Sequence, residues 1–98
     1  MSTIRLLVLD VLKPHEPSIL KLASFLGDVK GVDGVDISVY EIDSKVENVK
    51  ITLQGKDINF QKVKSIIEDN GATIHSIDKV GSGNILIKEA LTHQDNHS

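Results

Sequence analysis

The stretch that decides the fold is "VDISVYEIDSKVENVKITLQG", residues 35–55. Apolar and polar side chains alternate over residues 35–43 and again over residues 47–55, which is the period of a β-strand with one buried face. Only "SKV" separates the two alternating runs, so the stretch predicts a β-hairpin. The apolar residues expected to face inward are Val35, Ile37, Val39, Val49, Ile51 and Leu53.

On the N-terminal side, "TIRLLVLDVL" (residues 3–12) is apolar on both faces, which is typical of a strand at the centre of a sheet. "PSILKLASFLGDV" (residues 17–29) follows with helical spacing, and Pro17 suits the first turn of a helix. Its apolar stripe consists of Ile19, Leu20, Leu22, Ala23 and Leu26. A turn over residues 30–34 then leads into the hairpin.

On the C-terminal side, "INFQKVKSIIEDNG" (residues 58–71) predicts a second helix, and Gly71 is the kind of residue that ends a helix in a left-handed conformation. "ATIHSIDKV" (residues 72–80) predicts a fourth strand. "NILIKEAL" (residues 84–91) fits either a fifth strand or a short helix.

The predicted order is therefore β-α-β-β-α-β. With right-handed crossovers, this order gives an α+β ferredoxin-like sandwich with a four-stranded antiparallel sheet in the order 4-1-3-2. Both helices should lie on one face of the sheet. We expect one domain over residues 1–84 and a partly disordered C-terminal extension over residues 85–98.

The composition limits the function. The 98 residues include no cysteine, which excludes disulfides, thiol catalysis and cysteine-ligated metals and fits a cytoplasmic protein. The formal net charge of −3 and the presence of only two Phe and one Tyr argue against a nucleic-acid partner. No apolar run reaches the roughly 18 residues of a membrane span, so no membrane partner is expected.

Three stretches carry a resemblance to a known family. They are "RLLVLDVLKPHEPSI" (residues 5–19), "GVDGVDISVYEIDSKVENVKITLQG" (residues 31–55) and "GATIHSIDKV" (residues 71–80). Over residues 3–80 the chain resembles a family of short archaeal proteins of unknown function, domain-of-unknown-function family 211. The resemblance implies a ferredoxin-like fold and a tendency to form homo-oligomers. It implies no established activity, so no catalytic residue is carried over, and the tail after Val80 departs from the family's pattern.

The two faces of the sheet can be assigned by alternation. In the first strand we expect Ile4, Leu6, Val8 and Asp10 to face the helices. The residues expected on the open face are Leu7, Leu9, Val11, Tyr40, Ile42 and Ile77. An apolar face of this kind usually marks a contact site, which predicts a homo-oligomer. The alternative is that the chain's own tail, "ILIKEAL", covers the face.

A candidate site is predicted where "LDVLKPHEPSIL" (residues 9–20) follows the first strand. The first two strands run in the same direction, so this loop and the hairpin turn lie at one end of the sheet. The acidic and histidine residues gathered there are Asp10, His15, Glu16, Glu41, Asp43 and Glu47, against Lys13 and Lys45. Asp10 and Glu41 should share the core-side register at about 10 Å from each other.

Carboxylates gathered in this way repel one another, and a divalent cation would relieve the repulsion. Ca²⁺ and Mg²⁺ take oxygen ligands, and His15 would admit a softer ion such as Zn²⁺ or Mn²⁺. The candidate metal ligands are Asp10, His15, Glu16, Glu41 and Asp43. The alternative is a solvated acidic surface with charges near a helix start, in which Asp10 reaches water or a backbone N–H.

The remaining histidines carry weaker signals. His75 is expected to be an ordinary strand residue, and His93 and His97 have helical spacing but lie in a polar tail. No serine sits in the strand–turn–helix context of a hydrolase nucleophile. The leading hypothesis is a non-enzymatic homo-oligomeric module that binds a small ligand or divalent cation in a regulatory or scaffold role. The alternative is a metal-assisted or acid–base enzyme that uses Asp10, His15 and Glu41.

Overall fold

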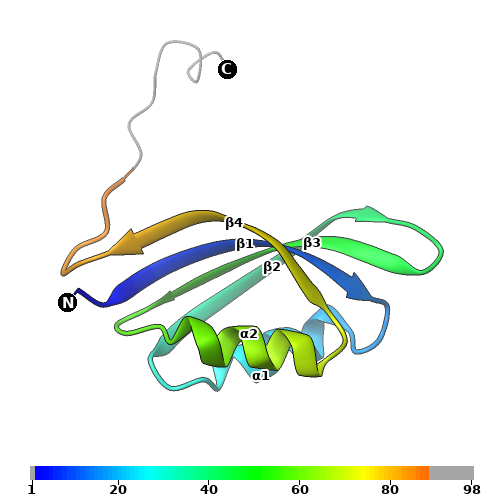
Figure 1. Ribbon diagram of the computed structural model, residues 1–98, viewed down its shortest axis with the longest axis horizontal. Helices are drawn as coiled ribbons and strands as arrows, with labels where there is room; N and C mark the ends of the chain where they lie inside the picture. The colour runs from blue at the N-terminus through cyan, green and yellow to red at the C-terminus, as the bar shows by residue number, and fades with distance from the viewer. Residues whose placement is uncertain (1, 89–98) are drawn as a thin grey trace, which may run out of the picture.

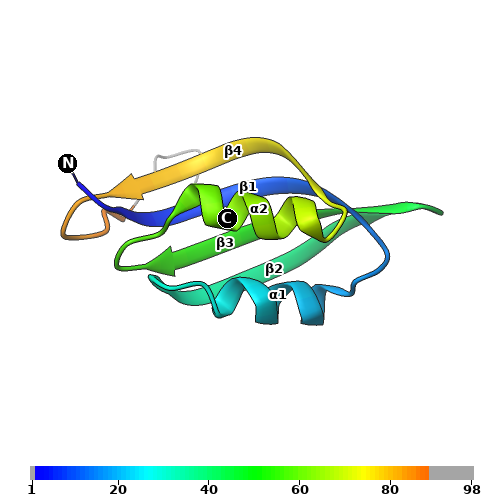
Figure 2. The same ribbon diagram turned by 60° about the horizontal axis from the view of Figure 1, so that its bottom comes forward.

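The strands and helices follow the predicted order in the computed structural model, which describes residues 2–88. The elements are β1 (Ile4–Pro14), α1 (Ile19–Gly27), β2 (Val32–Ile42), β3 (Val46–Gly55), α2 (Phe60–Asp69) and β4 (Thr73–Ser82). The sheet order is β2-β3-β1-β4, which is the predicted order read from the other edge, and the paired strands are antiparallel. Both helices lie on one face of the sheet (Figures 1 and 2). The ferredoxin-like α+β fold is thus confirmed.

The core lies between the helices and the two central strands. Leu7, Leu9 and Val11 of β1 stand opposite Leu53, Ile51 and Val49 of β3, and all six are buried. The helices contribute two buried residues each, Leu22 and Leu26 from α1 and Val63 and Ile67 from α2. Burial of a large aliphatic side chain stabilises the fold by about 1.5–3 kcal/mol, so this layer accounts for most of the driving force.

The predicted facing of β1 is correct for Ile4, which packs against the core, and wrong from Leu6 onward, after a register shift. Leu7, Leu9 and Val11 face the helices, so Leu6, Val8 and Asp10 belong to the open face. Directly paired residues of neighbouring strands share a face, and Leu9 pairs with Ile51 of the core. A one-residue error in register moves every side chain to the other face.

Two further residues expected on the open face have helix-side partners instead. Ile77 stands opposite Leu9, and Ile42 stands opposite Glu47, which itself pairs with the buried Lys13. Tyr40 is exposed and contacts Asp10, as an open-face residue should. The open face is therefore of mixed polarity rather than an aliphatic surface.

Helix α1 begins later than predicted. Ser18 caps it by accepting a hydrogen bond from the N–H of Lys21, so Pro17 precedes the cap instead of lying in the first turn. Leu20 was expected in the buried stripe, but it is 81% exposed. The end of α2 agrees with the prediction, because Gly71 follows the cap with φ of +83°.

Beyond β4 the described chain is short. Residues 84–88 form neither a strand nor a helix, and residues 89–98, with His93, His97 and the predicted disorder, lie outside the described residues. Arg5 holds the start of this segment, because its guanidinium donates to the carbonyls of Gly83 and Asn84. Among the described residues no helix is long and apolar enough to cross a membrane.

Candidate functional site

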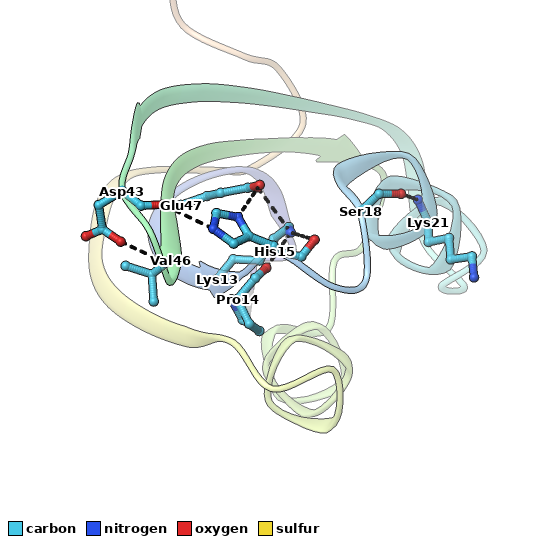
Figure 3. Close-up of polar contacts among 8 residues, drawn as sticks. All are labelled: Lys13, Pro14, His15, Ser18, Lys21, Asp43, Val46 and Glu47. Atoms are coloured by element: carbon cyan, nitrogen blue, oxygen red, sulfur yellow. Dashed lines mark hydrogen bonds and ion pairs between the residues drawn. The ribbon is translucent and has the colours of Figure 1, made fainter.

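A buried lysine lies at the end of β1. Lys13 is 1% exposed and points to the helix side of the sheet, opposite Glu47 of β3. Its Nζ lies 3.2 Å from Oε1 of Glu47 and donates to the carbonyls of Pro14 and His15 at 2.7 and 3.3 Å (Figure 3). A buried ammonium group needs such partners, since its desolvation is otherwise very costly.

His15 extends this network to the hairpin turn. Its Nδ1 lies 3.1 Å from Oε2 of Glu47, and its Nε2 lies 3.1 Å from the carbonyl oxygen of Asp43 (Figure 3). Both partners are acceptors, so the doubly protonated ring satisfies both contacts. The hydrogen bond to Glu47 raises the pKa of His15, and the same bond, aided by Lys13, lowers the pKa of Glu47.

The carboxylate of Asp43 stabilises the backbone of the hairpin turn. One carboxylate oxygen accepts hydrogen bonds from the backbone N–H groups of Lys45 and Val46, both at 2.9 Å. These bonds lower the pKa of Asp43. Glu16 is exposed in the loop before α1. Lys13, His15 and Glu47 therefore form a structural tie between the loop and the turn. The predicted ligands His15 and Asp43 already have hydrogen-bond partners there.

Asp10 lies elsewhere, on the open face between two β-bulges. In β2, Val39 pairs with Val49 and Glu41 with Asn48, which leaves Tyr40 as an extra residue. In β4, Ser76 pairs with Asp10 and Ile74 with Val11, which leaves His75 as an extra residue. Bulges are frequent next to functional sites because they redirect side chains.

The two bulges border a hollow of about 400 Å³ on the open face. We call it the bulge hollow, and its lining residues are Asp10, Val11, Leu12, Tyr40, Glu41, Asn48 and His75. The hydroxyl of Tyr40 donates a hydrogen bond to the carboxylate of Asp10, which raises the pKa of Tyr40. As far as the described residues show, the lining contains two carboxylates and no Lys or Arg, so it favours positive charge.

The structure thus divides the predicted site in two. It brings Asp10 and Glu41 to one hollow, on the open face and not in the predicted core-side register. It places His15 in the tie and the carboxylate of Asp43 in the adjoining hairpin turn. Within residues 2–88, no group of three or more His, Cys, Asp or Glu side chains is arranged to hold a metal ion.

Four residues were not predicted to take part in a site: Lys13, which belongs to the tie, and Tyr40, Asn48 and His75, which line the bulge hollow. One signal was present for the bulge at His75. The apolar residues of β4 come at Ile74, Ile77 and Val80, a spacing of three that no regular strand produces. An inserted residue between them would have explained the spacing.

Comparison with known proteins gives one family and one relative. The family model DUF211, described as "Uncharacterized ArCR", matches residues 5–96. The match continues past Val80, so the expectation that the tail departs from the family is wrong. The curated protein "Uncharacterized protein MJ0319" of Methanocaldococcus jannaschii is 50% identical over 97 residues, which cover 99% of this chain and 100% of that protein.

Proposed function

The chain belongs to the uncharacterised archaeal family DUF211, and from this premise we propose that it is a non-enzymatic homo-oligomeric module that binds a small ligand or a divalent cation. The observation that carries the proposal is the bulge hollow, in which residues from all four strands converge on Asp10. A regulatory or scaffold role fits a protein that binds without turnover, and the cytoplasmic location expected from the composition is part of the proposal.

The ligand part of the proposal rests on charge and space. Asp10 and Glu41 supply negative charge, Asn48 supplies an amide, and the hollow of about 400 Å³ has the size of a small-molecule site. Lys50 is the cross-strand partner of Asp10 but does not line the hollow. A cation is therefore the class of ligand that the lining favours.

Calorimetric titration of Ca²⁺, Mg²⁺ and Zn²⁺ into chelator-treated protein tests the divalent-cation form of the proposal. We expect heat and a thermal shift with at least one ion, and we expect Asp10→Asn to abolish both. Asp36→Asn is the matched control, because Asp36 is an exposed acid of β2 that lies about 13 Å from Tyr40 along that strand. Equal loss in both variants would indicate unspecific attraction to an acidic surface.

The assembly part rests on the sheet edges. Among residues 2–88, β2 and β4 each pair with one strand only, and both edge strands carry exposed apolar side chains, namely Ile42, Ile77 and Val80. Exposed strand edges of this length commonly associate with other chains. The alternative is that the chain's own tail covers the open face. In support of it, the side chain of Leu86 lies 3.5 Å from the position that a Cβ on Gly81 would occupy. Light scattering decides between them, and a monomer mass at micromolar concentration rejects the oligomer.

A second candidate, an acid–base enzyme, is favoured by one observation. Asp10, Tyr40 and His75 are all proton-transferring groups and line the same hollow. His15, which the sequence suggested for this role, is held by Glu47 and by the carbonyl of Asp43. Replacing His75 by Ala should abolish turnover in an activity screen if the enzyme reading is right, whereas a binding module would lose affinity alone.

A further inference from the structure

The size of the bulge hollow points to an occupant larger than an ion. A volume of about 400 Å³ falls in the range of sites for small organic molecules. A bare Ca²⁺ or Mg²⁺ ion would need about six or more oxygen ligands converging at roughly 2.0–2.6 Å. Among residues 2–88 no cluster of three metal-binding side chains exists, so most ligands would have to be water.

The polar lining suits an ammonium group better than a metal ion. An ammonium has three N–H donors, and the hollow offers acceptors on Asp10, Glu41 and Asn48. Hydrogen bonds from a charged donor to carboxylates are roughly twice as strong as neutral ones. The carboxylate of Asp10 also accepts from Tyr40, which holds it at a fixed place in the lining.

The apolar lining suits the rest of an organic cation. Tyr40 is 54% exposed, so part of its ring is accessible to a cation, and such contacts are favourable within about 6 Å of the ring centre. Leu12 is 40% exposed at the same hollow and offers contact for a short alkyl chain. A metal ion would gain nothing from either residue.

We propose that the bulge hollow binds a small primary ammonium compound with a short apolar chain, held by Asp10 and Glu41 and covered by the ring of Tyr40. This inference rests on the proposed function as a binding module and names the chemical class of its ligand. Asp10 and Glu41 provide the charge, Asn48 the third acceptor, and Leu12 the contact for the chain.

The test is a nuclear magnetic resonance titration of the full-length ¹⁵N-labelled chain. The probes are n-butylamine, the neutral n-butanol of similar size, and Ca²⁺. We expect n-butylamine to shift the backbone amides of Tyr40, Glu41, Asn48 and His75 in a saturable way, and n-butanol to leave them unchanged. Asp10→Asn should weaken the amine about tenfold, because one charge-assisted hydrogen bond is lost. Asp36→Asn should leave its affinity unchanged.

Two variants of Tyr40 separate the ring from the hydroxyl. Tyr40→Phe keeps the ring but removes the hydroxyl that holds Asp10 in place, so it should weaken the amine less than Tyr40→Leu does. Tyr40→Leu should weaken it about threefold through loss of the ring face. A folded Tyr40→Leu protein with unchanged affinity would contradict the role of the ring.

The outcomes also separate this inference from the proposed function. Equal shifts with n-butylamine and n-butanol, or equal weakening by Asp10→Asn and Asp36→Asn, overturn the inference. Binding of Ca²⁺ without binding of the amine overturns the inference and leaves the proposed function standing. If neither n-butylamine nor Ca²⁺ shifts the lining residues, the inference fails, and the Ca²⁺ form of the proposed function fails with it.

Discussion

The imidazole of His15 and the carboxylate of Glu47 are joined at 3.1 Å across 32 positions of the sequence. This contact ties the loop before α1 to the β2–β3 hairpin, which reaches beyond the helices at that end of the molecule (Figure 2). Each partner changes the pKa of the other, since the bond raises the pKa of His15 and lowers the pKa of Glu47. The tie is therefore strongest where both groups are charged.

The first prediction is a stability that depends on pH through this pair. The contribution of His15 is complete below its ordinary pKa of 6.5 and is lost as the pH rises through its raised folded value. The contribution of Glu47 is complete above its ordinary pKa of 4.5 and is lost as the pH falls through its lowered folded value. Urea unfolding should therefore show the largest contribution of the tie between about pH 4.5 and 6.5.

The control for this prediction is another histidine. His15→Asn should reduce the fall in stability between pH 6 and pH 8, and His75→Asn should retain it, because His75 makes no hydrogen bond or ion pair with Glu47 or Lys13 in the described structure. If His15→Asn keeps the full pH dependence of the natural protein, the tie is not its source.

The second prediction concerns the buried lysine. Glu47→Ala leaves Lys13, which is 1% exposed, with only two carbonyl partners, so we expect a loss of about 3–5 kcal/mol in the free energy of unfolding. The double variant Lys13→Met/Glu47→Leu should lose less free energy of unfolding than Glu47→Ala does, because no charge remains buried in it. Asp36→Ala, an exposed acid in the same hairpin, should stay within about 0.5 kcal/mol of the natural protein.

How far the sequence predicts this fold can be seen strand by strand. Clean alternation in residues 35–55 correctly assigned Val49, Ile51 and Leu53 to the core. β1 is apolar on both faces, so Leu6 and Leu7 were equivalent in the sequence, and only the pairing of Leu9 with Ile51 decides which side is buried.

The site was less predictable for two physical reasons. Lysine is almost never fully buried without a partner, so nothing in the residue type indicates that Lys13 is enclosed by Glu47 and two carbonyls. The bulges at Tyr40 and His75 depend on pairing between strands, and they bring distant residues to Asp10. Topology alone did predict that Asp10 and Glu41 lie at the same end of the sheet, and both line the hollow.

The third prediction checks the corrected facing of β1. Leu9 is fully buried, so Leu9→Ala should reduce the free energy of unfolding by about 2–5 kcal/mol. Leu12→Ala removes an equal volume from a side chain that is 40% exposed on the other face of the sheet. It should therefore reduce the free energy of unfolding clearly less than Leu9→Ala does. Urea titration of both variants provides the comparison, and equal losses would contradict the assigned register.

The fourth prediction uses the fact that the chain has one Tyr and no Trp. The hydrogen bond to Asp10 raises the pKa of Tyr40 above its ordinary value of 10.0. Ultraviolet titration of the tyrosinate should therefore give a midpoint above 10.0 in the natural protein and a lower midpoint in Asp10→Asn, where the carboxylate of Asp10 no longer opposes ionisation and only the weaker effect of Glu41 remains. Circular dichroism must show a folded protein at each pH. Identical midpoints would mean that Tyr40 and Asp10 are not bonded in solution.

The fifth prediction concerns the sheet edges and the proposed assembly. Ile77 and Val80 are 48% and 53% exposed on the edge strand β4, and a charge there should oppose association because edge lysines prevent strand edges from pairing. Ile77→Lys and Val80→Lys should each lower the mass measured by light scattering to that of a monomer.

Leu20→Lys is the matched control, since Leu20 is 81% exposed on α1 and belongs to neither edge, and it should leave the mass unchanged. If the natural protein is larger than a monomer and all three variants keep its mass, the contact does not involve β4, and the open edge of β2 with Ile42 becomes the next surface to test by the same substitution.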